Sequence, residues 1–450
     1  MTVAAEDASA ESCSADVAVI GAGAAGLAAA RRLADAGRSV LLLEARDRVG
    51  GRIWTVDDGI ELGAEFVHGE PEATLALLRE AGIGAVEFAG EHWVMRDGRL
   101  QRADDRAWSE AHRMLERAAH VERDMSVAEF LESAVRDGPG CNAVAARIRG
   151  MAEGYDAVDP ARASIRALVA EWAGSARPGA SSRPRGGYGA LVDHMLRKLD
   201  PVRVELRLES VVRVIRWSAE GVEIDFEQRG EMRRHRARKA IVTLPLGVLQ
   251  APPDDPATVK FEPPLEMKRE ALAGLSMGSA HRVALGFREA FWETMDGGRM
   301  KNAGFINTAG TTTGLPFRTF WTQLPERRAC LVAWVGGPAA VEVGERGGGT
   351  REGIIAQAVE SVRGVFGGTV DVEALLEEAW FHDWVSDPWS CGAYSYMNVG
   401  GDSARGKLAE PVAGTLYIAG EATDVSGEAS TVAGAIAEGE RAAREAGDPG

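Results

Sequence analysis

Cysteine is scarce in this chain of 450 residues, and basic residues are fewer than acidic ones. The four cysteines, Cys13, Cys141, Cys330 and Cys391, lie far apart and form no C-x-x-C pair, so neither a zinc site nor a disulfide framework is expected. Lys and Arg number 51 against 67 Asp and Glu, which gives a formal net charge of −16. This balance argues against non-specific binding to nucleic acid and favours neutral or cationic ligands.

Long hydrophobic runs are also missing. The longest apolar stretch, residues 17–30, is too short to span a membrane and is interrupted by three glycines. Residues 1–13 lack the basic flank and apolar stretch of a signal peptide, so they and residues 447–450 are expected to be flexible tails. These absences predict a soluble, cytoplasmic protein that binds no membrane, no nucleic acid and no metal ion.

The beginning of the chain has the pattern of a βαβ unit. An apolar run at 17–20 is followed by a glycine-rich segment at 21–26, an alanine-rich helical stretch at 27–36 and a second apolar run at 40–43. Continuous apolar runs of this kind are typical of parallel strands that are buried on both faces. The segment therefore predicts the start of a buried parallel sheet.

The remaining elements come from later in the sequence. Apolar runs at 240–244 and 415–419 are the candidates for further strands of the same sheet, which would make that domain discontinuous. Residues 104–172 have a helical pattern, and alternating segments at 281–287 and 329–335 suggest a separate antiparallel sheet. These last elements predict a second domain.

The glycine-rich segment has the spacing of a dinucleotide-binding turn. Gly21, Gly23 and Gly26 allow a sharp turn, close approach of the backbone to a pyrophosphate and tight packing of the helix on the strand. The helix amino terminus that follows presents free N–H groups. Glu44 stands at the end of the next strand, where its carboxylate can accept hydrogen bonds from ribose hydroxyls. The pattern predicts a dinucleotide but does not separate FAD from NAD, and the other interpretation is a glycine-rich turn beside a surface glutamate.

The residues that follow Glu44 resemble a known family. Arg48 to Arg52 is similar to the R-x-G-G-R pattern that follows the second strand in FAD enzymes of the flavin amine oxidase family, which contains monoamine oxidases, polyamine oxidases and histone lysine demethylases. Gly50 and Gly51 would let the backbone pass close to the cofactor, and Arg48 or Arg52 can donate to phosphate. Further segments that resemble the family, in its order, are 61–69, 242–249, 387–396, 419–421 and 430–435.

The resemblance implies an α/β fold of two domains. The FAD-binding domain would be Rossmann-like, of the GR2 type, and discontinuous, with residues 14–75, 185–255 and 400–446. Residues 76–184 and 256–399 would form an α+β substrate-binding domain with a mainly antiparallel sheet.

The resemblance also implies which residues contact FAD. Val212 would hold the adenine through its backbone, and Glu421 would bond the ribityl chain or the pyrophosphate, unless it is only an ordinary acid of an N-terminal turn. The helix opened by Thr431 and Val432 would direct N–H groups at the pyrimidine carbonyl of the flavin. The expected FAD contacts are Gly21, Gly23, Ala24, Ala25, Gly26, Glu44, Ala45, Arg46, Gly51, Arg52, Gly63, Ala64, Glu65, Val212, Thr243, Leu244, Pro245, Trp384, Gly420, Glu421, Thr431 and Val432.

Three positions depart from the family pattern. The family's lysine, which holds a water near the reactive flavin nitrogen, corresponds to Arg282, which can hold water but cannot act as a neutral base. Alternatively, Arg282 only pairs with a neighbouring acid. The cysteine that binds flavin in monoamine oxidases corresponds to Ala393, so the FAD is expected to be non-covalent and Cys391 irrelevant to it. Tyr394 matches one wall of the aromatic cage, whereas the other wall corresponds to Thr431, which leaves the site wider.

His68 and Trp384 each have two interpretations. In polyamine oxidases the histidine that matches His68 lines the substrate site and bonds the amine, but such a residue is also compatible with a core histidine held by the backbone. Trp384 and Trp389 fit the core better than a substrate wall, since tryptophans are usually packing residues. The predicted catalytic residues are Tyr394, His68, Arg282 and Thr431.

The resulting hypothesis is an FAD-dependent oxidoreductase that oxidises a C–N bond of an amine to an imine, which water hydrolyses to a carbonyl and an amine or ammonia. Dioxygen is the expected acceptor, with hydrogen peroxide as the product, in a monomer or homodimer. One alternative is an L-amino-acid oxidase or a desaturase of the same fold, in which Arg282 or another arginine would clamp a carboxylate. Another is a flavin-bound interaction protein without catalytic activity.

Overall fold

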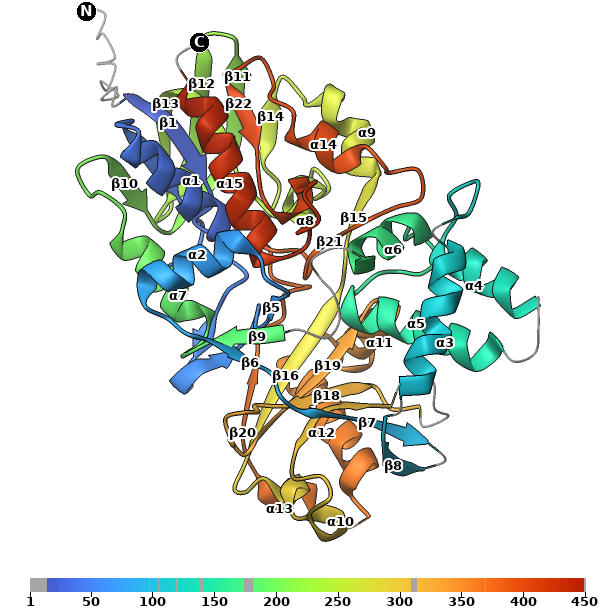
Figure 1. The fold of residues 1–450 in the computed structure, drawn as a ribbon. Helices are drawn as coiled ribbons and strands as arrows, with labels where there is room; N and C mark the ends of the chain where they lie inside the picture. The colour runs from blue at the N-terminus through green and yellow to red at the C-terminus, as the bar shows by residue number, and fades with distance from the viewer. Residues whose placement is uncertain are drawn as a thin grey trace, which may run out of the picture.

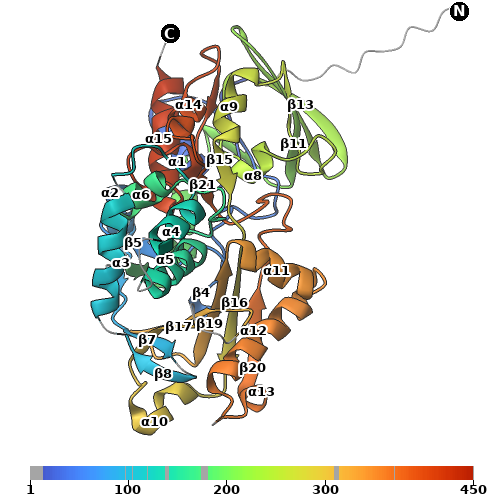
Figure 2. The same cartoon turned by 90° about the vertical axis from the view of Figure 1, so that its right-hand side faces the viewer.

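The computed structural model describes residues 14–96, 98–103, 105–118, 120–136, 141–173, 181–308, 314–368 and 370–448. The expected tail at 1–13, with Cys13, lies outside these residues. Figure 1 shows one sheet in each half of the molecule, with long strands running between the halves and a group of helices to one side. The turned view in Figure 2 shows the same separation of the two sheets.

The first sheet brings together the start, middle and end of the chain. In spatial order its strands are β10 (Val204–Arg207), β2 (Val40–Leu43), β1 (Ser14–Ile20), β13 (Glu231–Val242), β12 (Gly221–Gln228), β11 (Ser210–Ser218) and β14 (Lys260–Glu262), and β22 (Leu416–Ile418) pairs with β13. The four strands that were expected to be parallel, β1, β2, β13 and β22, are parallel. By contrast, β12 runs antiparallel to both β11 and β13, so the sheet is mixed.

Strand β13 is long enough to pair with three neighbouring strands. Its second half, residues 236–242, pairs with β1 on one edge. On the other edge its first half pairs with β12, and residues 240–242 pair with β22. This arrangement lets an antiparallel extension and a parallel core share one strand.

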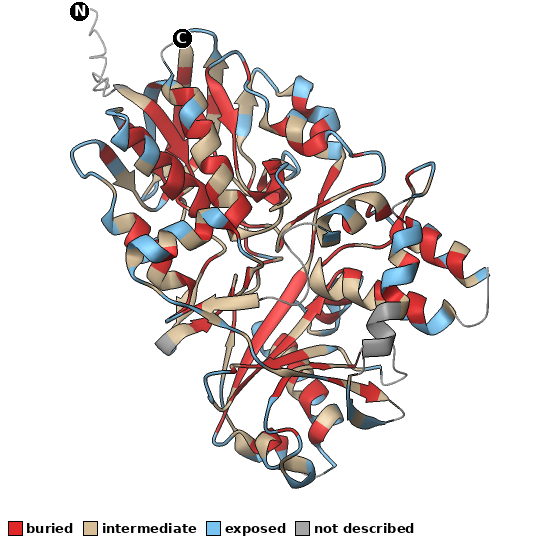
Figure 3. Cartoon of the chain, viewed as in Figure 1, coloured by how far each residue is buried: buried red, intermediate tan, exposed pale blue. Residues whose placement is uncertain are grey.

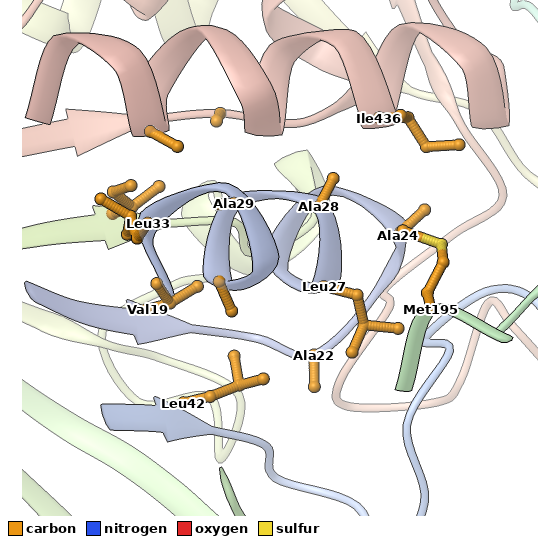
Figure 4. Packing of buried hydrophobic residues seen from close by; sticks show 14 of the residues in the cluster. Val19, Ala22, Ala24, Leu27, Ala28, Ala29, Leu33, Leu42, Met195 and Ile436 are labelled. Carbon is orange, nitrogen blue, oxygen red and sulfur yellow. The ribbon is translucent and has the colours of Figure 1, made fainter. Parts of the chain in front are cut away.

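The parallel strands are apolar throughout because both of their faces are covered. Val17 and Val19 of β1 belong to the hydrophobic cluster that contains helices α1 (Ala24–Asp35) and α15 (Val432–Gly447). Ala18 and Ile20 belong to the cluster on the opposite face. Figure 4 shows α1 packed between α15 and the strands. A Cβ atom at Gly439 would lie 2.1 Å from the carbonyl oxygen of Ala25, so glycine allows the close approach of these two helices.

The second sheet is mainly antiparallel, as expected. Its strands, in spatial order, are β20 (Leu376–Phe381), β16 (Ala280–Phe287), β19 (Cys330–Gly336), β18 (Thr319–Thr322), β17 (Ala303–Asn307), β7 (Glu91–Arg96) and β8 (Arg99–Arg102). Only β17 and β7 pair in parallel among these described strands. Strand β16 is buried along almost its whole length, as Figure 3 shows, and its first residues reach the first sheet's half of the molecule.

The predicted helical region forms a compact group. It contains α3 (Asp105–Ala118), α4 (Val127–Arg136), α5 (Cys141–Tyr155) and α6 (Ile165–Ala173). Ser126 and Glu129 form a reciprocal capping box at the start of α4, since the backbone N–H of each residue donates to the side chain of the other. After this group of helices, the short strand β9 (Ser181–Pro184) pairs with β5 (Val67–His68) and β6 (Ala85–Glu87).

The other elements are short or peripheral. The helices are α2 (Glu72–Ala81), α7 (Tyr188–Arg197), α8 (Leu246–Leu249), α9 (Arg269–Ala273), α10 (Met295–Gly298), α11 (Pro338–Arg346), α12 (Arg351–Phe366), α13 (Val372–Leu375) and α14 (Ala404–Ala409), and the strands are β3 (Thr55–Val56), β4 (Ile60–Glu61), β15 (Leu275–Met277) and β21 (Ser395–Met397). Helix α15 continues to Gly447, one residue into the expected tail. None of the helices in the described part of the chain combines the length and apolar character needed to cross a bilayer.

Candidate functional site

A large cavity opens at the carboxyl ends of the parallel strands, where ligands of open α/β sheets usually bind. It contains about 1630 Å³ of empty space, including the open solvent at its mouth. Its walls come from the ends of β1, β2, β13 and β22, from the first turns of α1 and α15, and from the start of β16. The cavity therefore extends from the glycine-rich turn to the long strand that leads into the second sheet.

The glycine-rich turn has the geometry that its spacing predicted. Gly21 has a φ of +99°, which residues with a side chain rarely adopt. A Cβ atom at Gly26 would lie 1.8 Å from the carbonyl oxygen of Gly21, so only glycine lets α1 pack on this turn. The Thr243 hydroxyl donates to the carbonyl oxygens of Ile20 and Gly21, at 2.9 and 3.0 Å. Gly26 thus shapes the turn from behind and does not line the cavity.

Glu44 is buried at the end of β2 and lines the cavity. Its Oε2 accepts a hydrogen bond from the backbone N–H of Ala22 at 2.8 Å, and its Oε1 accepts one from the N–H of Arg46 at 3.0 Å. These bonds hold the carboxylate directly beside the glycine-rich turn. The interpretation as a surface glutamate is therefore wrong.

The two arginines of the R-x-G-G-R segment have different environments. Arg48 does not line the cavity; its guanidinium donates to the carbonyl oxygens of Val49, Gly51 and Ile53 and lies over the ring of Trp54. Arg52 does line the cavity. Of the two, only Arg52 is placed to reach a ligand, whereas Arg48 holds the loop together.

Glu421 is buried beside the cavity with both carboxylate oxygens engaged. Its Oε1 lies 2.8 Å from Nη1 of Arg52, and its Oε2 accepts a hydrogen bond from the Ser395 hydroxyl at 2.6 Å. Burial alone would raise the pKa of Glu421, but Arg52, Ser395 and Arg405 outweigh it and leave this pKa below its usual value. This geometry favours the interpretation of the Glu421 carboxylate as a structural acid that fixes Arg52.

Helix α15 begins at the cavity wall. The Thr431 side chain caps it by accepting a hydrogen bond from the N–H of Gly434 at 3.1 Å. Ser430, Thr431 and Val432 all line the cavity. A helix of 16 residues therefore directs its amino terminus at whatever occupies this end of the cavity.

Arg282 lines the cavity and forms a buried ion pair with Glu65, at 2.5 Å between Nη1 and Oε2. Glu65 also accepts hydrogen bonds from Arg183 Nε at 2.6 Å and from Trp321 Nε1 at 2.9 Å. Burial would raise the pKa of Glu65, but Arg282 and Arg183 lower it to about 2. Glu65, a predicted FAD contact, instead lies behind the cavity wall, because three donors occupy its carboxylate. Arg282 therefore pairs with a buried acid and also lines the cavity.

His68 also lies outside the cavity lining. Its Nδ1 is 3.1 Å from the Ser181 hydroxyl, and its ring makes an edge contact with Tyr155, with 5.3 Å between the ring centroids. Burial lowers the pKa of His68 to about 4, so the ring is neutral at pH 7. In this position His68 supports Tyr155 and does not contact a ligand in the cavity.

Two aromatic residues stand at the end of the cavity near Arg282. Tyr394 was predicted, and its hydroxyl donates to the carbonyl oxygen of Tyr155 at 2.6 Å. Trp334 of β19 was missed, although it lines the same cavity and lies opposite Arg282 in the β16–β19 ladder. The available signal was the alternation in the predicted strand 329–335, which places Val332 and Trp334 on one face and Leu331, Ala333 and Val335 on the other.

The remaining predicted residues surround the same cavity. Trp384 is buried, with Nε1 donating to the Leu62 carbonyl oxygen at 2.7 Å, and it also lines the cavity. Trp389 lines the cavity too. Cys391 is not among the lining residues, whereas Ala393 is. The predicted residues that line the cavity are Gly21, Gly23, Ala24, Ala25, Glu44, Ala45, Arg46, Gly51, Arg52, Gly63, Ala64, Val212, Thr243, Leu244, Pro245, Arg282, Trp384, Tyr394, Gly420, Glu421, Thr431 and Val432.

Among the described residues, no group of three or more His, Cys, Asp or Glu side chains is arranged to hold a metal ion. The donors at the cavity are instead backbone N–H groups, hydroxyls and guanidinium groups. These are groups that bind phosphate and polar ring atoms.

Comparison with known proteins gives consistent matches. A family model described as flavin containing amine oxidoreductase matches residues 24–446. Lysine-specific histone demethylase 2 of Homo sapiens is 28% identical over 91% of this chain and 50% of its own length, so the chain spans about half of that relative. Polyamine oxidase 3 of Oryza sativa subsp. japonica is 27% identical over 95% of this chain and 88% of its own length. Wild-type putrescine oxidase, in a structure with putrescine bound, shares the fold with a TM-score of 0.76 at 22% identity, over 96% of this chain and 99% of its own.

Proposed function

We propose, on the premise that this chain belongs to the family of flavin containing amine oxidoreductases, that it oxidises a C–N bond of an amine to an imine. Water then hydrolyses the imine to a carbonyl compound and an amine or ammonia. Dioxygen is the proposed electron acceptor, which makes hydrogen peroxide the second product. The proposed location is the cytoplasm, and the proposed assembly is a monomer or homodimer.

The cavity fits FAD, which is the cofactor of this family. The glycine-rich turn and the start of α1 offer backbone donors to a pyrophosphate, and Glu44 offers a fixed carboxylate to ribose hydroxyls. Ala393 lines the cavity where a covalent attachment would need a cysteine, and the thiol of Cys391 donates to the carbonyl oxygen of Pro388 instead. The cofactor is therefore bound without a covalent bond. The proposed FAD-binding domain consists of residues 14–75, 185–255 and 400–446.

When bound, FAD supplies the two-electron oxidation of the amine carbon. The chain's own residues prepare the reactants. The amino terminus of α15 would stabilise negative charge on the pyrimidine ring, as helix amino termini do for anions. Tyr394 and Thr431 would border the amine, and burial there lowers the pKa of an amine, which favours the neutral form that has a lone pair.

Arg282 supports this preference for a neutral amine. Arginine stays protonated at physiological pH, and Arg282 and Arg183 share the single carboxylate of Glu65, so this group of side chains keeps a net positive charge at the cavity wall. A positive charge disfavours an ammonium ion beside it. Because Arg282 is already paired with Glu65, it fits the clamp for a substrate carboxylate less well, which favours an amine over an amino acid as the substrate.

The observation that carries the proposal is the single cavity that connects the glycine-rich turn and Glu44 with Tyr394, Arg282 and the start of α15. The test is flavin reduction without oxygen, followed by absorbance, with polyamines, monoamines and amino acids as candidate substrates. Reduction by an amine, with a carbonyl product, is the expected result. If the purified protein contains FAD but no candidate substrate reduces this FAD, the better interpretation is a flavin-bound interaction protein without catalytic activity.

A further inference from the structure

Two aromatic side chains of the cavity are tied to neighbouring carbonyl groups of one helix. The indole Nε1 of Trp334 donates to the carbonyl oxygen of Gly154 at 2.5 Å, and the hydroxyl of Tyr394 donates to that of Tyr155 at 2.6 Å. Gly154 and Tyr155 are the last two residues of α5. The carbonyl groups of a final helical turn have no partner within the helix, so these side chains satisfy acceptors that would otherwise stay unpaired.

The end of α5 is held close to the strands that carry the cavity wall. A Cβ atom at Gly336, two residues after Trp334, would lie 2.3 Å from the carbonyl oxygen of Glu153. A Cβ atom at Gly278, just before β16, would lie 2.7 Å from the carbonyl oxygen of Ala157. Because both positions are glycine, the backbone at the end of α5 can lie directly against the backbone of β19 and of the residues just before β16. The two rings therefore share one rigid support.

Trp334 also contacts a second aromatic ring, on the neighbouring strand β18. Its ring centroid lies 6.0 Å from that of Trp321, which is buried and donates to Glu65. The Trp334 ring is itself only half-buried, and it lines the cavity. With its N–H group engaged in a hydrogen bond, the rest of the indole offers apolar aromatic surface to a ligand.

We infer that Trp334 is a substrate-contacting residue that determines specificity, and that with Tyr394 it forms an aromatic wall for the carbon skeleton of the amine. This inference rests on the proposed function. The ligand class is an amine whose nitrogen carries an alkyl or cycloalkyl body, because the wall offers apolar surface without a free donor. Trp334 supplies an aromatic surface at the cavity while Thr431, which lines it too, has only a small side chain.

The test measures anaerobic flavin reduction by butylamine, hexylamine, octylamine and cyclohexylamine in Trp334→Leu, Trp334→Phe and the wild type. For Trp334→Leu we expect the apparent Kd of the preferred amine to rise about tenfold, which is the scale of losing one aromatic contact, with a smaller change in the limiting rate. The ranking of cyclohexylamine against the linear amines should shift as well. Trp334→Phe keeps a ring and should have an intermediate effect.

A matched control is Trp217→Phe. Trp217 Nε1 also donates to a backbone carbonyl oxygen, that of Pro263, but this side chain does not line the cavity. The control should keep the wild-type ranking of amines, and FAD content should be unchanged in all variants. If Trp334→Leu does not fold, the inference is tested by whether Trp334→Phe changes the ranking of the four amines.

Two results would overturn the inference. The first is that amines reduce the wild-type flavin but the Trp334 variants keep the wild-type apparent Kd and the wild-type ranking of amines. This result leaves the proposed function intact. The second is a wild-type flavin that none of these four amines reduces: if a polyamine still reduces it, only the inference is overturned, and if no amine of any class reduces it, the proposed function is overturned as well.

Discussion

Nη1 of Arg282 lies 2.5 Å from Oε2 of Glu65, and both side chains are about 95% buried. Arg183 binds the other oxygen of the same carboxylate. One buried acid therefore serves two arginines, and the three side chains carry a net positive charge when all are ionised. A lysine at position 282 could give up its proton after burial, but an arginine cannot, so this charge on the cavity wall is permanent.

Removing one member of this group should destabilise the fold. In Arg282→Leu, Glu65 would keep only Arg183 and Trp321 as partners, and we expect the free energy of unfolding to fall by about 3 kcal/mol, as when other buried ion pairs are broken. Urea denaturation measures this change. In the double variant Glu65→Gln with Arg282→Leu, part of the loss should be recovered; additive effects of the two substitutions would contradict a direct interaction.

The same substitution should change the acid sensitivity of the protein. The pKa of Glu65 is about 2 in the folded protein against an ordinary value of 4.5, so its contribution to stability is complete above pH 4.5 and is lost as the pH falls towards 2. Without Arg282 this pKa should rise towards 4.5, so the stability that the protein loses between pH 4.5 and pH 2 should be smaller than in the wild type. Denaturation curves measured across this pH range would show the difference.

Glu61 should produce the opposite pH dependence. Burial raises its pKa to about 7 from an ordinary 4.5, although it accepts hydrogen bonds from Tyr188 N–H and Thr55 Oγ1. Between these values the unfolded chain has released the proton and the folded protein keeps it, so this group's contribution to stability falls as the pH rises, by up to about 3 kcal/mol. Glu61→Gln should flatten the profile between pH 5 and pH 7. Glu72→Gln, at a largely exposed side chain, is the control.

Gly26→Ala should abolish FAD binding. The added Cβ would lie 1.8 Å from the Gly21 carbonyl oxygen, so either the turn or α1 must move. Absorbance of the purified protein reports its FAD content. Gly368→Ala is the matched control, because no atom lies within 4 Å of the Cβ it would add. A Gly26→Ala variant with full FAD content would contradict the predicted role of the turn.

Tyr394→Ala should raise KM or lower the rate of flavin reduction about tenfold while FAD stays bound, because one aromatic wall is lost. Tyr394→Phe keeps the ring and leaves only the Tyr155 carbonyl oxygen without its donor, so its effect should be smaller. Stopped-flow reduction without oxygen separates the two parameters. Kinetics equal to those of the wild type in Tyr394→Ala would exclude Tyr394 from the substrate site.

Much of the fold followed from local patterns in the sequence. The apolar runs at 17–20 and 40–43 predicted β1 and β2 because a strand buried on both faces needs apolar residues at every position. The helical pattern of residues 104–172 predicted α3 to α6 because helical periodicity spans only a few residues, as does the capping contact between Ser126 and Glu129. The antiparallel β12 was not predicted, although its apolar and polar residues alternate, and its partners β11 and β13 are known only from the fold.

The candidate site was predicted where it depends on a continuous segment and missed where it depends on distant contacts. Gly21, Gly26 and Glu44 belong to one βαβ unit, and their geometry agrees with their spacing. Glu65 was assigned to the cofactor, but Arg282, distant in sequence, turns its carboxylate away from the cavity. Trp334 was missed because its place at the cavity depends on the pairing of β19 with β16.

The sequence by itself determined the glycine-rich turn and the strands on either side of it, because these depend on backbone conformation and on short-range spacing, and its motifs resemble those of the family. Only the tertiary structure decided which charged and aromatic side chains reach the cavity. That choice depends on partners far apart along the chain, such as Glu65 for Arg282 and Gly154 for Trp334. A buried charge or ring donor turns towards the group that compensates it, and the identity of that group is known only once the chain has folded.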